Sequence, residues 1–354
     1  MVHHGESVCL DYYFKRQVNQ IPPRREKIKN NLSRGCRICE KGAKMVLFVT
    51  GICHRTCWYC PLSGERKGKD LTYANEHMVD CPGQAVEVAH RMSALGTGVT
   101  GGEPLVRPER VIAYCSQLKE EFGSEHQIHL YTGIAPDRDM LTRLAGIVDE
   151  IRLHPPVEIW GQVLSSEYAE SAVNAKEMGF DIGFEVPALP EVGVLNDALP
   201  LLDFLNINEL EWGGHNADGM RERSYMLEDG LHNAIEGARE WASQISKEEK
   251  VHFCSSSFKD SVQLRKRLIR VARNTARSFD HITRDGTIIY GNFTPHEKDR
   301  EWLKHLKTGT YEDLGDHVEL SWRVLRSNAE TLSGESCIIE RYPDRGIIVE
   351  VTPI

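Results

Sequence analysis

The stretch AKMVLFVTGICHRTCWYCPLS, residues 43–63, joins an apolar run to a loop with three closely spaced cysteines. The run from 43 to 51 is almost continuously apolar and ends in a glycine, as expected for a strand buried on both faces. Cys53, Cys57 and Cys60 follow at once, in the spacing C-x3-C-x2-C. This arrangement predicts a buried strand with a thiol-rich loop at its carboxyl end.

Three thiols in one loop favour a particular kind of metal site. A structural zinc site usually needs four ligands, supplied as two cysteine pairs. The nearby pair Cys36 and Cys39 could complete such a site. A [4Fe–4S] cluster also takes four thiolates, so a loop that supplies three leaves one iron open to a small molecule. The spacing favours the cluster and leaves zinc as the alternative.

Strand and helix patterns alternate through most of the chain. Short apolar runs are separated by amphipathic stretches, which indicates a parallel sheet with right-handed crossovers. This α/β pattern predicts a partial or full (β/α) barrel, and a doubly wound open sheet is the alternative. The predicted strands cover residues 43–51, 96–104, 127–133, 148–155, 181–189, 206–214 and 250–257, and the predicted helices cover 83–95, 108–122, 137–147, 167–178, 195–205, 230–245 and 261–277.

The two ends of the chain differ from this pattern. Residues 1–42 are predicted to form an N-terminal arm that carries the Cys36–Cys39 pair, and residues 43–279 the barrel. Residues 280–354 predict a small α+β appendage. An Asp-Gly turn lies in ITRDGTIIYGN, and a hairpin is expected around PDRG.

Composition excludes several classes of protein. The 354 residues are 40% hydrophobic and 27% charged, which is ordinary for a globular protein in water. No apolar run approaches the ~20 residues of a membrane span, and the start has no apolar signal-peptide core. We therefore expect a cytoplasmic protein without membrane contact. Its ten cysteines are then expected to be metal ligands, reactive thiols or core residues rather than disulfides.

The cysteine loop resembles that of the radical S-adenosylmethionine (SAM) superfamily. Tyr59 stands directly before the third cysteine, and TGGEP, residues 100–104, ends the next predicted strand. The two motifs, in this order and on adjacent strand ends, carry the resemblance over residues 43–260. In that superfamily the cysteines that match Cys53, Cys57 and Cys60 hold a [4Fe–4S] cluster, and SAM chelates the open iron.

The resemblance also implies residues that bind SAM. Gly101 and Gly102 would let the backbone approach the cofactor closely, and Glu103 would pair with the SAM ammonium. Thr132, in YTG, is expected to contact the SAM ribose or carboxylate. Glu185 is expected near the adenine and ribose, and its alternative role is a carboxylate satisfied inside the barrel. The expected cofactor-binding residues are therefore Tyr59, Gly101, Gly102, Glu103, Pro104, Thr132 and Glu185.

The resemblance implies an enzyme. A reduced cluster, supplied by an electron donor such as ferredoxin or flavodoxin, would cleave SAM to a 5′-deoxyadenosyl radical that abstracts hydrogen from an unreactive carbon. A small-molecule substrate is favoured. The alternatives are a macromolecule, either a glycyl-radical protein or a tRNA nucleoside, and, less favoured, a zinc-binding module without catalysis. The stretches GCRICEKGAKMVLFVTGICHRTCWYCPLS, NINELE and CSSSFKDSVQLRKRL further resemble a mostly archaeal family related to pyruvate formate-lyase activating enzymes.

A second metal centre is an open interpretation. Cys36 and Cys39 are candidates for a second Fe–S or zinc site with Cys254 as a third ligand, and packed thiols are the alternative. Cys254 ends the last predicted strand, whereas Cys39 precedes the first. Because a strand of about seven residues spans about 23 Å, the arm would have to fold back over the barrel to unite them.

The helix predicted at 261–277 combines an apolar stripe with many cations. RNA contact is one interpretation. The net charge of −9 favours the other, in which the cations are solvated or paired with acids. The cations are Arg265, Lys266, Arg267, Arg270, Arg273 and Arg277.

Overall fold

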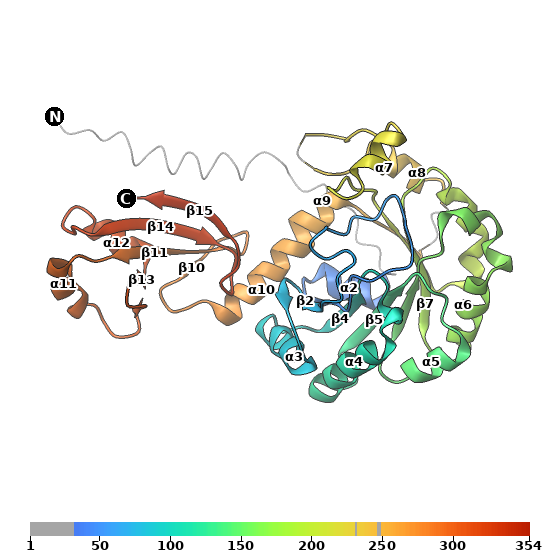
Figure 1. Cartoon of the computed structure of the whole chain (residues 1–354), viewed down its shortest axis with the longest axis horizontal. Coiled ribbons are helices and arrows are strands. Elements are labelled where there is room, and N and C mark those ends of the chain that lie inside the picture. Colours follow the sequence, from blue (N-terminus) through green and yellow to red (C-terminus); the bar gives the residue numbers. More distant parts are fainter. Residues whose placement is uncertain (1–31, 231, 246–248) are drawn as a thin grey trace. The chain divides into compact units, whose positions relative to one another are not determined.

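The structure is a computed structural model that describes residues 32–230, 232–245 and 249–354 (Figure 1). Most of the predicted N-terminal arm lies outside the described residues. The described chain contains two sheets, one of nine strands and one of six. The larger sheet and its helices carry the candidate site.

The larger sheet is a partial (β/α) barrel. Its seven central strands run parallel in chain order, and β9 does not pair back to β1 within the described residues. An antiparallel pair, β2 (Tyr73–Ala74) and β3 (His77–Met78), extends the sheet beyond β1. The parallel strands are β1 (Lys44–Phe48), β4 (Gly96–Thr100), β5 (Gln127–Thr132), β6 (Glu150–Leu153), β7 (Asp181–Pro187), β8 (Phe204–Asn208) and β9 (Val251–Cys254).

Side chains on these strands alternate between two surroundings. In β1, Met45 and Leu47 are fully buried in the hydrophobic core, whereas Lys44, Val46 and Phe48 line an interior cavity. The alternation follows from the period of two in a strand. One face of the sheet therefore packs against the helices, and the other face forms the wall of a site.

The helices on the outer face match most of the predicted ones. Figure 1 shows α3, α4, α5 and α6 following one another around the strands. Their apolar positions recur at helical spacing and are buried. These helices are α3 (Pro82–Arg91), α4 (Pro108–Phe122), α5 (Arg138–Leu144) and α6 (Glu167–Glu177), and the basic helix is α10 (Arg265–Thr275).

Two predicted helices differ from the structure. The helix expected at 195–205 is a 3-10 segment, Val192–Leu201, which contains Pro200. The helix expected at 230–245 is reduced to α8 (Ala238–Ala242). Gly237 has a left-handed backbone, and Ala234 and Ile235 form isolated β-bridges with Glu211 and Leu227. Residues 234 and 235 therefore use their backbone N–H and C=O groups in these bridges and not in a longer helix.

A short helix, α2 (Arg34–Glu40), begins at Ser33, whose side chain accepts a hydrogen bond from the Cys36 backbone N–H. This helix contacts β1, β4 and β5. A methyl group on Gly35 would lie 2.6 Å from the guanidinium of Arg152, so glycine is required for this close approach. α2 therefore lies against the interior face of the barrel.

The six-stranded sheet is antiparallel and has its own small core. The hairpins expected at the Asp-Gly turn and around PDRG are both present, as β10–β11 and β14–β15. The core residues are Phe293, Leu303, Val318, Leu320 and Leu325. The elements are β10 (His281–Ile282), β11 (Ile288–Thr294), α11 (Arg300–Lys304), β12 (Tyr311–Asp313), β13 (Val318–Leu320), α12 (Trp322–Asn328), β14 (Glu335–Arg341) and β15 (Ile348–Pro353).

Candidate active site

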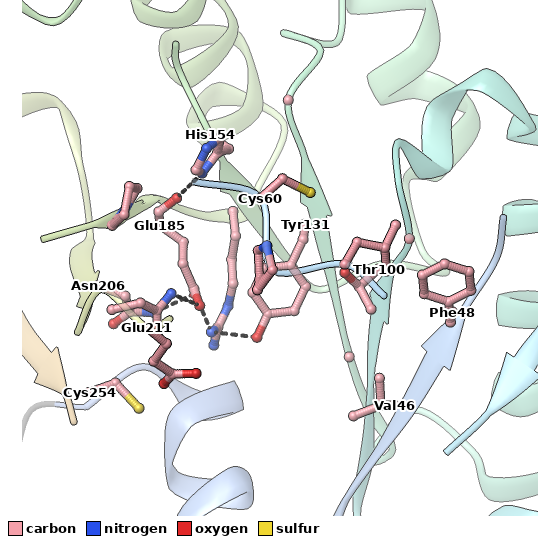
Figure 2. A pocket seen from close by; sticks show the side chains of 18 of the residues that line it. Val46, Phe48, Cys60, Thr100, Tyr131, His154, Glu185, Asn206, Glu211 and Cys254 are labelled. Atoms are coloured by element: carbon pink, nitrogen blue, oxygen red, sulfur yellow. Dashed lines mark hydrogen bonds and ion pairs between the residues drawn. The ribbon is translucent and has the colours of Figure 1, made fainter. Parts of the chain in front are cut away.

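A cavity of about 880 Å³ occupies the interior of the barrel (Figure 2). Side chains from every parallel strand line it, together with α2 and the loop after β1. All the residues expected to bind cofactor or metal, from both predicted sites, are among its lining residues. The structure therefore brings together groups that lie more than two hundred residues apart in the sequence.

The cysteine loop leaves the carboxyl end of β1 and covers part of this cavity. Cys53 is exposed, and Cys57 and Cys60 are half-buried. The Cys60 N–H donates to the Cys57 carbonyl at 3.1 Å, which folds the C-x2-C segment into a turn. Burial raises the pKa of the Cys53 and Cys57 thiols.

The two glycines of TGGEP bring two strand ends into backbone contact. Gly102 N–H donates to Thr50 O at 2.7 Å, and Glu103 N–H donates to Ile52 O at 2.8 Å. An added Cβ would lie 2.5 Å from Thr50 O at Gly101 and 2.6 Å from Ile52 O at Gly102. Glycine is needed here because the cysteine loop packs directly on this turn. The two glycines therefore allow a close approach of this turn to the neighbouring backbone.

Glu103 is buried and its carboxylate is fully hydrogen-bonded. Oε1 accepts from Leu105 N–H at 3.0 Å and from Thr132 Oγ1 at 2.8 Å. Oε2 accepts from Gly133 N–H at 2.6 Å and from Ile134 N–H at 3.2 Å. A carboxylate has about four acceptor positions, so these bonds use its capacity. Glu103 and Thr132 thus tie the end of β4 to the loop after β5.

Arg55, inside the cysteine motif, is a site residue that sequence reasoning missed. Its guanidinium donates to the His154 carbonyl at 2.7 Å, and it also bonds the Gly133 carbonyl and the Tyr168 hydroxyl. Arg55 therefore links the cysteine loop to the ends of β5 and β6. A basic residue between the three closely spaced cysteines is the available signal, but its partners depend on the tertiary fold.

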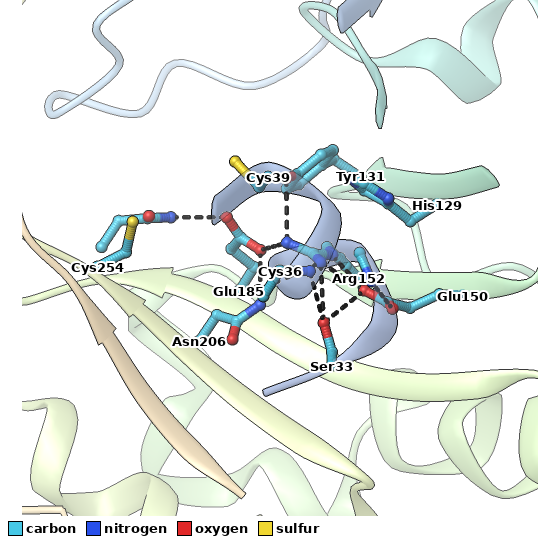
Figure 3. A network of polar contacts seen from close by, with 12 residues as sticks. Ser33, Cys36, Cys39, His129, Tyr131, Glu150, Arg152, Glu185, Asn206 and Cys254 are labelled. Atoms are coloured by element: carbon cyan, nitrogen blue, oxygen red, sulfur yellow. Dashed lines mark hydrogen bonds and ion pairs between the residues drawn. The ribbon is translucent and has the colours of Figure 1, made fainter. Parts of the chain in front are cut away.

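Glu185 lies in a buried charge network, drawn in Figure 3. Its Oε2 accepts from Arg152 at 2.6 Å, and its carboxylate also accepts from the amides of Asn206 and Asn208. Burial alone would raise the pKa of Glu185, but Arg152, the two amides and Lys44 outweigh it and lower the pKa. The carboxylate of Glu185 therefore has partners inside the barrel, and the residue also lines the cavity.

Arg152 is the centre of that network. Its Nε donates to Glu150 at 2.6 Å, and its other nitrogens reach Glu185, Tyr131 and Ser33. Arg152 is only 3% exposed, so this is a buried cation between two carboxylates. Lys44, at the start of β1, lies near the same group and contacts the Tyr131 hydroxyl at 3.4 Å. The inner end of the cavity is therefore polar and charged.

Comparison with known proteins agrees with this geometry. Residues 38–168 match a family described as a 4Fe-4S single cluster domain, and residues 286–354 match a domain of unknown function, DUF8061. A protein of Methanocaldococcus jannaschii, "Putative glycyl-radical enzyme activating enzyme MJ0021", is 38% identical over an alignment of 289 residues, and the match covers 77% of this chain and 76% of the relative. The chain belongs to the radical SAM superfamily.

Among solved structures, the crystal structure of Streptococcus suis SuiB bound to S-adenosylmethionine shares 14% sequence identity with this chain. The match has a TM-score of 0.37 and covers 60% of this chain and half of SuiB. This degree of likeness supports no statement about the site. The family relationship rests on the M. jannaschii relative and on the cluster domain.

This radical SAM enzyme uses a [4Fe–4S] cluster and SAM. Its donor set fits such a cluster, because three soft thiols of one loop line one cavity. Among the described residues, no three His, Cys, Asp or Glu side chains are placed to hold a single metal ion. The ligands of a cubane cluster lie farther apart than those of one ion, so that finding does not bear on the cluster.

The basic helix of this radical SAM enzyme faces other parts of the chain. Lys266 donates to the Glu40 carbonyl, Arg267 pairs with Glu76 at 2.7 Å, and Arg270 donates to the Met92 carbonyl. Arg265 and Arg277 also bond neighbouring groups. Within the described part of the chain, no helix is both long and apolar enough to cross a membrane.

Proposed function

We propose that Cys53, Cys57 and Cys60 hold the [4Fe–4S] cluster and that the enzyme abstracts hydrogen from a small molecule bound in the barrel cavity. The observation that carries this proposal is the cavity itself. Its volume of about 880 Å³ lies within the range of pockets that enclose small ligands. It runs from the cysteine loop to the charged residues near α2.

The cluster, when bound with SAM, supplies a one-electron cleavage that makes hydrogen abstraction from an unreactive carbon feasible. The chain's own residues position these groups. Glu103 holds the loop after β5, and Arg55 holds the ends of β5 and β6 against the cysteine loop. The walls of the SAM site would be the turn after β4, Tyr59, Thr132 and Glu185, which all line the cavity.

The inner part of the cavity is suited to a polar substrate. Lys44 and Arg152 supply cations there, and Glu185 supplies an anion. Asn206 is 2% exposed, and its side-chain oxygen has no hydrogen-bond partner among the described residues. A buried unpaired acceptor is costly, so a donor group of a ligand would stabilise it. These residues favour a compact molecule with both hydrogen-bond donors and acceptors.

Activation of a glycyl-radical protein is the second candidate function. The observation that favours it is the name of the M. jannaschii relative, a glycyl-radical enzyme activating enzyme, at 38% identity. A protein substrate would have to deliver an extended backbone segment to the cavity. An electron donor such as ferredoxin or flavodoxin is part of either proposal.

The decisive experiment uses the anaerobically reconstituted enzyme with dithionite and SAM. We expect 5′-deoxyadenosine to form, and Cys57→Ala to abolish it, while Cys81→Ala, a change of an exposed cysteine outside the cavity, leaves it intact. Extract from cells grown in deuterated medium is then divided by size. Deuterium in 5′-deoxyadenosine from the small-molecule fraction supports the proposal. Deuterium from the protein fraction alone, with a glycyl-radical EPR signal, would overturn it in favour of the second candidate.

A further inference from the structure

The cavity contains a second group of thiols, separate from the cysteine loop. We propose that Cys36, Cys39 and Cys254 bind a second iron–sulfur cluster, of the [4Fe–4S] type, at the inner end of the cavity. This inference concerns a different set of cysteines from the proposed function, although Lys44 and Arg152 lie beside both, and it does not depend on the identity of the substrate. Figure 3 shows the three cysteines around the same polar network.

The geometric obstacle expected from the sequence is absent. The arm that carries Cys39 has to fold back over the barrel to reach Cys254, and α2 does so, because it lies against the inner face of the sheet and beside the segment Lys259–Leu264. All three cysteines line one cavity. Cys36 and Cys39 stand three residues apart on α2, so they lie on the same face of that helix.

One side chain spans two of these thiols. The Cys39 thiol donates to Gln263 Oε1 at 2.9 Å, and Gln263 Nε2 donates to Cys254 Sγ at 3.7 Å. A single amide group therefore separates Cys39 from Cys254. Gln263 belongs to a π-helical turn, Lys259–Leu264, a rare conformation that is frequent at functional sites. Turning this side chain aside would open the space between the two sulfurs.

The spacing of the thiols suits a cluster better than a single ion. Among the described residues, no three potential ligands are placed around one metal ion. Cys36, Cys39 and Cys254 are therefore not arranged around a single ion either. Thiols separated by a side-chain amide are too far apart to share one zinc, whose Zn–S bonds are about 2.3 Å. A cubane fills a larger space and takes each thiolate at a different iron.

The charges around the thiols are compatible with thiolate ligands. Arg152 donates to Cys36 Sγ at 3.5 Å, and Lys44 and Lys259 line the same part of the cavity. Lys259 is paired with Glu211 at 2.6 Å and Arg152 with two carboxylates, so the cations are held in place. Three thiolates would leave one iron of the cluster without a cysteine ligand.

Iron analysis of the reconstituted full chain tests the inference. Two clusters would give about eight irons and eight sulfides per chain, and one cluster about four. We expect about eight in the natural protein and about four in the triple variant Cys36→Ala, Cys39→Ala, Cys254→Ala. A control with Cys81→Ala and Cys337→Ala should retain about eight, because neither residue lines the cavity.

A second triple variant separates this inference from the proposed function. With Cys53, Cys57 and Cys60 changed to alanine, the chain should keep about four irons and lose all cleavage of SAM. About four irons in the natural protein, with none left in this variant, would overturn the second cluster and leave the proposed function standing. A single zinc beside four irons would also overturn it. Because the natural protein is measured first, poor folding of a variant does not remove the test.

Discussion

The hydroxyl of Tyr59 lies 3.0 Å from Nε2 of His154, which ties the cysteine loop to the end of β6. His154 Nδ1 lies 2.7 Å from the Glu185 carbonyl, and a carbonyl oxygen only accepts. Burial lowers the pKa of His154, so the ring is neutral at pH 7. Nδ1 therefore carries the proton, Nε2 accepts, and Tyr59 donates. The aromatic residue of the cysteine motif thus has a polar function in addition to its packing.

Changing Tyr59 to Phe should destabilise the site locally. The change leaves Nε2 of His154 buried without a donor, at a cost of about 1–3 kcal/mol. Urea unfolding of the reconstituted enzyme measures this cost. Tyr225→Phe is the matched control, because its ring also packs against Trp58 and has no hydrogen bond to His154 among the described residues. Equal midpoints for Tyr59→Phe and the natural protein would contradict the assigned hydrogen bond.

Glu103→Gln should loosen the loop after β5, because the Glu103 carboxylate accepts hydrogen bonds from that loop. The amide can keep one oxygen for Leu105 and Thr132, but its NH2 group would face the Gly133 and Ile134 N–H donors. Losing these two part-buried hydrogen bonds to a charged acceptor costs about 1.5–3 kcal/mol for each. We expect both a lower unfolding free energy and a weaker SAM-induced change in the EPR spectrum of the reduced cluster. A change in SAM response with no loss of stability would show instead that Glu103 contacts the cofactor directly.

The periodic parts of the fold follow from the sequence, and the irregular parts do not. Apolar runs such as 43–51 and amphipathic runs such as 108–122 predict β1 and α4, because burial fixes their spacing. The stretch 230–245 has a helical pattern, but bridges to residues 211 and 227 are formed instead. Those bridges join residues distant in sequence, so no local pattern signals them.

The site was predictable as a set of residues but not as a set of contacts. The cysteine and glycine motifs identify which loops line the cavity, since strand ends of a parallel sheet meet at one edge. The partners of Glu103 and Arg55 depend on how two loops pack against each other. Loops have no periodic sequence pattern from which such contacts could be predicted. The approach of Cys39 to Cys254 depends on where α2 folds, and the strand-length argument gives only the condition that the arm must fold back over the barrel.

Arg152→Met should be strongly destabilising. Arg152 is buried between Glu150 and Glu185, and its removal leaves two buried carboxylates without their cation. Breaking a buried pair in this way costs about 3–5 kcal/mol. The matched control is Arg138→Met, because Arg138 pairs with Glu177 on the exposed surface, where a pair is worth ~1 kcal/mol or less. Similar losses of unfolding free energy in the two variants would contradict the buried network.

Stability should fall as the pH drops below neutral, and His126 should account for part of the fall. Burial and the nearby Lys119 lower the pKa of His126 to about 4, whereas an unfolded histidine titrates near 6.5. Between these values the unfolded chain binds the proton and the folded chain does not. The stabilisation is thus complete above about pH 6.5 and is lost progressively at lower pH.

The contribution of His126 can be measured from the unfolding free energy at two pH values. From pH 7.5 to 5, the contribution of His126 amounts to about 2 kcal/mol of unfolding free energy. We expect His126→Gln to lose less stability than the natural protein over that interval, and His305→Gln, at an exposed histidine, to behave like the natural protein. If His126→Gln follows the same pH profile as the natural protein, His126 is not held neutral by the fold.

The basic helix α10 should not bind tRNA. Most of its cations already donate to groups of the chain, such as Arg267 to Glu76 and Arg270 to the Met92 carbonyl. Binding phosphates would require these bonds to be broken, and the net charge of −9 opposes association with a polyanion. Filter retention of labelled tRNA at low salt checks this, with Arg265, Lys266 and Arg267 changed to alanine as the comparison. We expect the same weak retention for both proteins. Strong, salt-sensitive retention that the triple change removes would show that the helix releases its internal partners, and would favour RNA as the substrate over a small molecule.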